Sequence, residues 1–263
     1  MVEKIAVVTG GSSGIGRETA KALAARGLRV YELSRRDFAC AGITHLSADV
    51  TDETAVQDAI DQVLCAEGRV DILVNCAGFG VSGAVEFTEL TDARRQMDVN
   101  FFGTVNVTKA VLGPMRRAGR GRIVCVSSVA APAAIPFQAF YSASKAAIND
   151  YACALANEVR PYGVSVCAVM PGDIRTGFTD ARKKSAVGDE AYGGRISKSV
   201  AKMERDERNG MSPAAAGRYI AKLALRRRVK PLYAIGFSYK CVCFLCDLLP
   251  CRLRNRLIGR LYA

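Results

Sequence analysis

A glycine-rich turn between a buried strand and a helix constrains this chain more than any other feature. Residues 5–9 are mostly β-branched, as expected for a parallel strand that is buried on both faces. The turn that follows reads Thr-Gly-Gly-Ser-Ser-Gly-Ile-Gly over residues 9–16, and a helical stretch runs from about 17 to 26. In this context the glycines let the backbone approach a phosphate, and the helix N-terminus attracts a pyrophosphate. The turn therefore predicts a dinucleotide-binding α/β protein.

The rest of the chain continues the alternation of strand and helix. Further strands are predicted at residues 28–33, 45–50, 70–74, 122–126, 164–169 and 232–235, and helices at 53–66, 88–117, from about 141, and after Ser212-Pro213. With 263 residues the chain can bury a substantial core. We predict one domain over residues 1–263, a Rossmann-type doubly wound parallel β-sheet flanked by helices, with a C-terminal extension at 236–263.

Positive charge is concentrated towards the C-terminus. From Met211 onward the sequence has eleven lysines and arginines and one acidic residue, Asp247, so a net charge of +10 out of the formal +12 lies there. This distribution indicates a basic tail instead of a nucleic-acid-binding domain, and a peripheral membrane contact through that tail is one expectation. No apolar stretch approaches the roughly 20 residues of a membrane-spanning helix. Ten cysteines scattered through predicted strands and helices indicate a reducing, cytoplasmic location.

Tyr141 and Lys145 are the first candidates for chemistry. Residues four apart share a helix face, so the phenol and the ammonium can meet in one site. A tyrosine normally titrates near pH ~10, and a nearby ammonium favours the phenolate and lowers that pKa. The spacing alone also fits an amphipathic helix with a surface lysine, so the surrounding motifs have to decide.

Residues at the ends of predicted strands define a candidate adenosine site. Ser34, Arg35 and Arg36 stand about 20 positions beyond the glycines, where a carboxylate would bind the ribose hydroxyls of NAD. Guanidinium groups suit the 2′-phosphate of NADP instead, although the nearby Asp37 keeps NAD as an alternative. Asp49-Val50 is a plausible clamp on the adenine ring. The only histidine, His45, lies away from this site and is interpreted as structural.

These motifs, in this order, resemble those of the short-chain dehydrogenase/reductases. The resemblance covers residues 4–176 and rests on five motifs: 9–16, Asn75 to Gly78, Asn100, Ser128 with Tyr141 and Lys145, and Pro171-Gly172 with Thr176. It implies that Tyr141 is the general acid/base, that Ser128 holds the substrate oxygen, and that Lys145 lowers the tyrosine pKa and holds the nicotinamide ribose. Asn100 would keep a water molecule in a proton relay. Ser128 is chosen over Ser127 because the family's serine precedes the tyrosine by about a dozen residues.

The residues and the resemblance together predict an NADP(H) site. Its members are Gly10, Ser12, Ser13, Gly14, Ile15, Gly16, Ser34, Arg35, Arg36, Asp49, Val50, Asn75, Ala77, Gly78, Tyr141, Lys145, Pro171, Gly172, Ile174 and Thr176. Two positions depart from the family pattern: Cys76 replaces a usual asparagine, and Ala131 replaces a common glycine. Neither is a catalytic group.

The substrate is predicted from the apolar loop 130–140, a lid at 177–212 and the tail at 236–263. In the tail, arginines and leucines form adjacent stripes: Arg252, Arg256 and Arg260 beside Leu253, Leu257 and Leu261. This ending resembles hydroxysteroid- and retinol-type members, so a hydroxysteroid dehydrogenase acting on a bulky hydrophobic alcohol or ketone is predicted first. The alternatives are a 3-oxoacyl or acyl-glycerone-type lipid ketoreductase, and a dinucleotide-binding sensor without turnover. The tail could equally pack on the core or on a second subunit.

Two further expectations concern metal and assembly. The spacing of Cys241, Cys243, Cys246 and Cys251 lacks the separated pairs of a zinc ribbon, so no metal site is predicted. The family mostly pairs subunits through the helices that correspond to 88–117 and 141–160. The resemblance therefore implies a homodimer or homotetramer.

Overall fold

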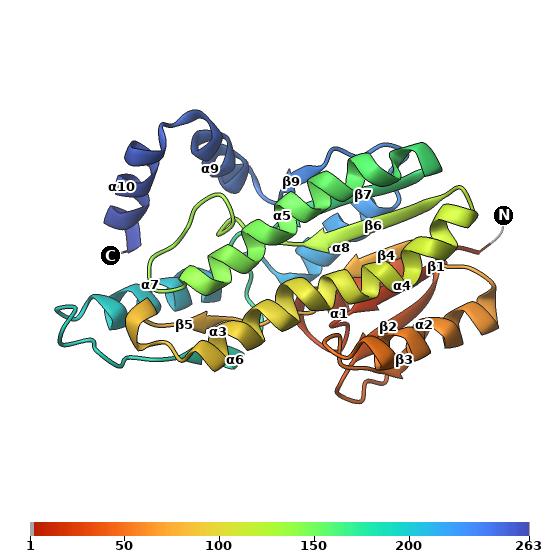
Figure 1. The fold of residues 1–263 in the computed structure, drawn as a ribbon, viewed down its shortest axis with the longest axis horizontal. Helices are drawn as coiled ribbons and strands as arrows, with labels where there is room; N and C mark the ends of the chain where they lie inside the picture. The colour runs from red at the N-terminus through yellow and green to blue at the C-terminus, as the bar shows by residue number, and fades with distance from the viewer. Residues whose placement is uncertain (1–2, 263) are drawn as a thin grey trace.

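The centre of the molecule is a seven-stranded parallel sheet with the strand order β3-β2-β1-β4-β6-β7-β9. The computed structural model describes residues 3–262 (Figure 1). The strands are β1 (Ile5–Thr9), β2 (Arg29–Ser34), β3 (Ile43–Ser47), β4 (Ile72–Asn75), β6 (Gly121–Val126), β7 (Val164–Met170) and β9 (Leu232–Ala234). The chain moves outward from β1 to β3, returns to β4 beside β1, and then continues in the other direction. Ligands bind at such a switch point, outside the carboxyl ends of the strands.

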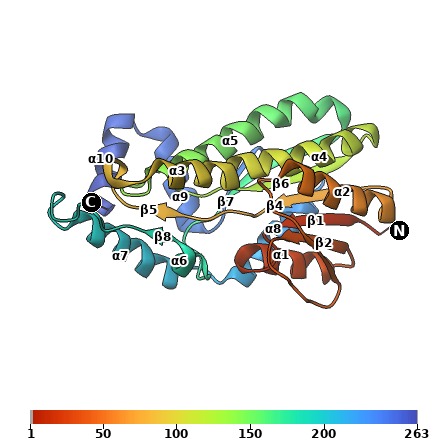
Figure 2. The ribbon, with the colours of Figure 1, turned by 60° about the horizontal axis from the view of Figure 1, so that its bottom comes forward.

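Helices cover both faces of the sheet, so the predicted doubly wound fold is confirmed (Figure 2). Helices α1 (Gly14–Ala24) and α8 (Pro213–Ala224) pack on one face, and α2 (Glu53–Glu67), α4 (Gly103–Arg117) and α5 (Ala139–Val159) on the other. Successive side chains of β1 alternate between the two resulting cores, because side chains of a strand point to opposite faces. Both faces are buried, which explains the continuous apolar run that begins the sequence.

The predicted helix over 88–117 is divided into three parts. Helix α3 (Leu90–Met97) is followed by a π-helical segment (Asp98–Phe102) and then by α4. A Cβ atom at Gly103 would lie 2.5 Å from the Val50 side chain, so a glycine suits the point where this segment meets the loop after β3. The wider π turn rotates Asn100 into the interior. The third strand also ends earlier than predicted, so that Asp49 and Val50 lie in the loop after β3.

The region predicted as a lid is ordered and paired with the rest of the molecule. It contains α6 (Phe178–Ala181), the short strand β8 (Lys183–Lys184) and α7 (Arg195–Arg208). Strand β8 pairs in parallel with β5 (Val81–Ser82), which follows the end of β4. Short 3₁₀ turns occur at Val85–Phe87 and Arg160–Tyr162. The lid is thereby attached to the edge of the sheet at which ligands are expected.

Two helices, α9 (Phe237–Leu248) and α10 (Cys251–Tyr262), form a hairpin after the last strand. In Figure 1 the hairpin stands beyond the end of the sheet, beside the loop between β6 and α5, and its end approaches α7. Ile258 of α10 and Cys246 of α9 pack against Ala133 in that loop. No helix in the described part of the chain combines the length and apolarity needed to cross a bilayer.

Candidate active site

The first turns of α5 bring Tyr141 and Lys145 to the end of β6. The buried Lys145 Nζ donates to the Val126 carbonyl at 2.9 Å and lies 5.7 Å from the centre of the Tyr141 ring. In return, the Ser127 hydroxyl donates to the Lys145 carbonyl at 2.8 Å. These two hydrogen bonds fasten the helix to the strand. Ser127 thus has a structural role, and Ser128 is left to face the tyrosine hydroxyl, with which it shares a hydrogen bond.

Burial dominates the electrostatics of the two residues on α5. It raises the pKa of Tyr141 to about 12, although the hydrogen bond with Ser128 and the charge of Arg182 act in the opposite direction. It also lowers the pKa of Lys145 to about 8. The expected lowering of the tyrosine pKa by Lys145 is therefore not seen in this structure. Loss of hydration of the phenolate outweighs the attraction of positive groups nearby.

Asn100 is fully buried and links three parts of the site. Its Oδ1 accepts a hydrogen bond from the Phe79 N–H at 3.0 Å, and its Nδ2 donates to the Phe79 carbonyl at 3.1 Å and to the Ser144 hydroxyl at 3.0 Å. The Ser144 hydroxyl in turn donates to the Tyr141 carbonyl. The side chain therefore points into the interior between the loop after β4 and α5, as its predicted functional role requires.

The glycine turn leaves a cradle that side chains would fill. Gly10 and Gly14 have positive φ values of 64° and 54°, and a Cβ atom at Gly10 would lie 2.9 Å from Ala77 Cα. A Cβ atom at Gly16 would lie 2.3 Å from the Gly10 carbonyl oxygen, so the start of α1 can approach β1 only with glycine. Ile15 packs partly buried against the core. The cradle fits a dinucleotide phosphate at the N-terminus of α1.

The end of β4 closes the middle of the site. The Thr9 hydroxyl accepts hydrogen bonds from the backbone N–H groups of Cys76 and Ala77, at 3.0 and 3.1 Å. Buried Asn75 donates to Thr108 at 3.1 Å. A Cβ atom at Gly78 would lie 3.1 Å from Asn100 Oδ1 and 3.5 Å from Lys145 Nζ. Gly78 therefore keeps open the space directly beside these two polar groups.

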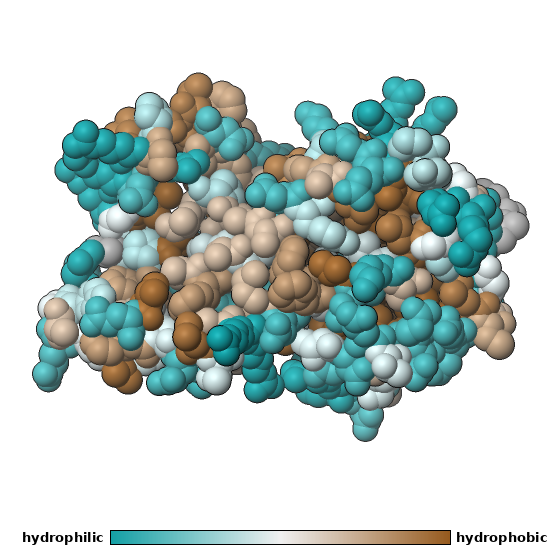
Figure 3. Space-filling model, viewed as in Figure 1, coloured by the Kyte–Doolittle hydropathy of each residue, from teal (hydrophilic) through white to brown (hydrophobic). Residues whose placement is uncertain are grey.

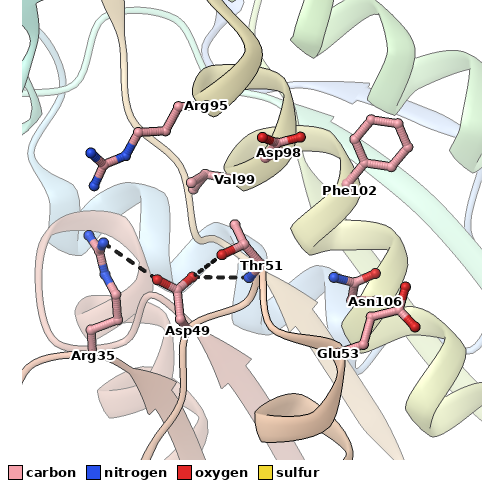
Figure 4. A pocket seen from close by; sticks show the side chains of 9 residues that line it. All are labelled: Arg35, Asp49, Thr51, Glu53, Arg95, Asp98, Val99, Phe102 and Asn106. Carbon is pink, nitrogen blue, oxygen red and sulfur yellow. Dashed lines mark hydrogen bonds and ion pairs between the residues drawn. The ribbon is translucent and has the colours of Figure 1, made fainter. Parts of the chain in front are cut away.

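An open pocket of about 450 Å³ lies at the predicted adenosine end (Figure 4). The Arg35 guanidinium lies 3.6 Å from Asp49 Oδ2, and Asp49 Oδ1 accepts hydrogen bonds from the N–H and hydroxyl of Thr51. Burial works against ionisation of Asp49, but these hydrogen bonds and the charges of Arg35 and Arg95 hold its pKa below the usual value. Several lining residues were not predicted: Thr51, Glu53, Arg95, Asp98, Val99, Phe102 and Asn106. The one sequence signal that could have identified them is that they lie within a few residues of Asp49 or Asn100, which were predicted.

Ser34 and Arg36 contribute to this end in different ways. The Arg36 guanidinium donates to the hydroxyls of Ser12 and Ser13, at 3.3 and 3.0 Å, and so lies over the glycine turn. The Ser34 hydroxyl points inward to Glu32, a fully buried carboxylate that also pairs with His45. His45 is structural, as predicted. The alternative NAD-directed carboxylate, Asp37, extends into solvent.

The loop after β7 reaches the opposite end of the site. The Pro171 carbonyl accepts from the Val129 N–H, Ile174 is buried, and Thr176 lies beside Gly14 across the cradle. The aromatic ring of Tyr239, from α9, lies against Gly172, where a Cβ atom would approach it to 2.2 Å. The Tyr239 hydroxyl donates to Asp173 Oδ2 at 2.6 Å. This contact between the C-terminal hairpin and the loop was not predicted, because no motif marks it.

The lid provides an aromatic and a buried cation beside the tyrosine. The rings of Phe178 and Tyr141 are 5.7 Å apart, and the Arg182 guanidinium lies 5.4 Å from the centre of the Phe178 ring. Arg182 is 4% exposed and pairs with Glu207 of α7. The pair holds β8 and α7 together over the site. Both residues were missed because they lie in a charged segment that has the composition of a solvated surface.

The cysteines of the tail pack as apolar side chains. Cys243 and Cys246 are buried, the former beside Met170 and the latter beside Ala133. Cys241 and Cys251 are exposed. Within residues 3–262, no three or more histidines, cysteines or carboxylates gather in a way that could hold a metal ion.

Comparison with known proteins agrees with this geometry. The family model described as short chain dehydrogenase matches residues 4–186. The chain is 41% identical to a 3-ketodihydrosphingosine reductase from Bacteroides thetaiotaomicron over 247 residues, which cover 90% of this chain and 92% of the relative.

Solved structures show the same fold over nearly the whole chain. A short-chain dehydrogenase from Streptomyces avermitilis superposes with a TM-score of 0.85 at 31% identity, over 98% of this chain and 96% of that one. ElxO with NADP bound superposes with a TM-score of 0.76 at 25% identity, over 91% of this chain and all of that one. The chain therefore belongs to the short-chain dehydrogenase/reductase family of oxidoreductases, which act on CH–OH groups with NAD(P)(H).

Proposed function

We propose that this protein is an NADPH-dependent reductase that converts a long-chain lipid ketone into a secondary alcohol. The observation that carries the substrate class is the 41% identity to 3-ketodihydrosphingosine reductase over 90% of the chain. This reverses the order suggested by the sequence, which placed a hydroxysteroid first and a lipid ketone second. The hydroxysteroid stays as the second candidate because the apolar loop that leads to Tyr141 packs against the tail hairpin.

The chain's own residues supply a proton and hold the substrate oxygen. A bound NADPH would deliver hydride to the carbonyl carbon; the protein provides position and the proton. Tyr141 is protonated across the neutral range because its pKa is raised to about 12, so it can donate to the forming alkoxide. Ser128, which is hydrogen-bonded to the phenol, holds the same oxygen. The Lys145 ammonium would return the proton that Tyr141 gives up, and Asn100 would hold the water molecule that relays it in the polar space beside Gly78.

We infer a preference for NADP(H) over NAD(H) from the adenosine end. Arg35 and Arg36 border the place where a 2′-phosphate would lie, while Asp37 faces solvent. A charge-assisted hydrogen bond contributes about 1.5–3 kcal/mol, so one guanidinium contact favours NADP(H) roughly tenfold or more. The relative with NADP bound supports this assignment.

The location and assembly remain those expected from the sequence. We propose a cytoplasmic location, because ten cysteines scattered through strands and helices are compatible with a reducing compartment. We propose that subunits pair through α4 and α5, since Ala143 and Ala154 leave small exposed positions on α5 that permit close packing between helices. Light scattering should then show a dimer or a tetramer at micromolar concentration, and a monomer would refute this assembly.

The function is tested by an NADPH-consumption screen in detergent micelles. The panel contains 3-ketodihydrosphingosine, an acylated dihydroxyacetone, ketosteroids and acetoacetyl thioesters. We expect turnover of 3-ketodihydrosphingosine, which is a long-chain amino ketone, and little turnover of the ketosteroids. Turnover of ketosteroids without reduction of either long-chain ketone would overturn the proposed substrate class. NADPH binding without turnover of any member would favour the sensor.

A further inference from the structure

Large apolar side chains are exposed mainly on the C-terminal hairpin. In the part of the chain that the structure describes, eight of the fourteen large hydrophobic residues that are exposed belong to α9 and α10. Phe237 is 84% exposed, Phe244 65% and Leu248 66%. Figure 3 shows that apolar and charged residues are mixed over the hairpin on the side that it views. A concentration of exposed apolar side chains on one hairpin marks an interaction site.

The exposed residues follow helical spacing, so they form stripes. On α9 the stripe runs through Phe237, Cys241, Phe244, Leu245 and Leu248. On α10 it consists of Leu253, Leu257 and Leu261, at intervals of four residues. The opposite side of the hairpin is occupied, because Cys243, Cys246 and Ile258 pack on the body of the protein. The stripes therefore face outward.

Cations lie directly beside the leucine stripe. Arg252, Arg256 and Arg260 each precede one of the three leucines, and all three are exposed. Within residues 3–262 none of them forms an ion pair. Asp247 is the one acidic side chain on the two helices. Another copy of this hairpin would bring its own arginines towards these, so charge disfavours a second subunit as the occupant.

We propose that the α9–α10 hairpin docks on an anionic phospholipid surface. Its leucines and phenylalanines enter the boundary between headgroups and acyl chains, and its arginines contact lipid phosphates. Helices with an apolar side and a cationic side bind membranes in this orientation without spanning them.

The hairpin also touches the loop after β7 and the lid. Tyr239 contacts the loop at Gly172 and Asp173, and Tyr262 lies 5.1 Å from Lys202 of the lid helix α7. Docking would place the lid next to the bilayer, where a long-chain ketone is dissolved. This last step rests on the proposed lipid substrate, whereas the docking itself does not.

Vesicle co-sedimentation of the full chain tests the docking without any substrate. The vesicles contain phosphatidylcholine alone or phosphatidylcholine with phosphatidylglycerol. Two triple variants are compared with the parent, L253S/L257S/L261S and R252Q/R256Q/R260Q. Matched controls change exposed residues elsewhere: V85S/L90S for the apolar set and K222Q/R227Q/R228Q for the charged set.

We expect the parent to bind anionic vesicles more tightly than neutral ones, and less tightly as salt is raised. Each hairpin variant should bind at least about tenfold more weakly, while the controls bind like the parent. Circular dichroism checks that the helices are retained; the arginine variant, which leaves every apolar contact in place, keeps the test valid if the leucine variant unfolds.

Three outcomes would overturn docking: no binding of the parent, equal losses in the controls, or unchanged binding of both hairpin variants. A different result would assign the face to a second copy of the chain: the parent forms an oligomer and does not bind vesicles, and the leucine variant no longer forms that oligomer. Activity on a micellar ketone is measured separately, so failure of the docking and failure of the proposed substrate are distinguishable.

Discussion

Replacement of Tyr239 by phenylalanine tests whether the C-terminal hairpin supports the cofactor-binding loop. The Tyr239 hydroxyl donates to Asp173 Oδ2 at 2.6 Å, and its ring lies against Gly172. Both residues of the loop stand between Pro171 and Ile174, where the nicotinamide end of the cofactor is predicted. Phenylalanine keeps the ring contact and removes only the donor. The substitution therefore isolates the hydrogen bond from the packing.

The structure sets the expected size of the effect. Burial raises the pKa of Asp173, and the hydrogen bond from Tyr239 opposes this shift, so the bond stabilises the carboxylate. Hydrogen bonds to charged groups contribute about 1.5–3 kcal/mol, and both partners are only half-buried. We therefore expect a loss of about 1.5 kcal/mol in unfolding free energy. A loosened loop should also weaken NADPH binding about three- to tenfold, which corresponds to ~0.6–1.4 kcal/mol.

Urea unfolding and NADPH fluorescence titration measure these two quantities. Y192F is the matched control, because the Tyr192 hydroxyl also donates to a carboxylate, that of Glu86, but at 3.2 Å on the exposed surface. Exposed contacts of this kind are worth little, so the control should stay within about 0.5 kcal/mol of the parent and bind NADPH normally. If Y239F loses no more than Y192F in either measurement, the hairpin does not hold the loop through this bond.

Three more predictions concern the site itself. Y141F should retain NADPH affinity and lose turnover by about two to four orders of magnitude, because the proton donor is gone; near-normal turnover would exclude Tyr141 as the acid. R35D should reduce the NADPH-over-NADH affinity ratio at least about tenfold by fluorescence titration, and an unchanged ratio would place the 2′-phosphate elsewhere. Because burial lowers the pKa of Lys145 to about 8, its charge is present below that pH and is lost above it. The rate of ketone reduction should therefore fall as pH rises through about 8, and a flat profile up to pH 10 would contradict this role.

Much of the fold could be predicted because burial and turn chemistry are local. Strand β1 is buried at every position, which its apolar residues predict. At Gly16 any larger residue would collide with the carbonyl of Gly10, so the glycine itself indicates the turn. The break between α3 and α4 could not be predicted, since a π turn leaves no distinct sequence pattern and the segment reads as one helix. The π turn points Asn100 inward, and this orientation could not be predicted from the sequence for the same reason.

The contacts made by the lid and the tail could not be predicted from the sequence for a different reason. Arg182 and Glu207 are charged residues in a charged segment, and only their distance in space shows that they form a buried pair beside Phe178. Tyr239 lies 66 positions from Asp173 in the chain. Pairings of this kind depend on how α7 and α9 return to the sheet edge, which no spacing along the chain encodes.

The electrostatic state of the catalytic pair shows what a motif leaves undecided. Four-residue spacing correctly places Tyr141 and Lys145 together, and from that spacing alone the ammonium should favour the phenolate. In the folded chain the same burial that brings them together removes water from both, so the pKa of Tyr141 rises and that of Lys145 falls. A tyrosine that stays protonated at neutral pH is suited to giving a proton to an alkoxide, which is the direction of ketone reduction. Oxidation of an alcohol requires the phenolate and should become faster only at higher pH, so the ratio of the two rates measured across pH reports directly on this balance.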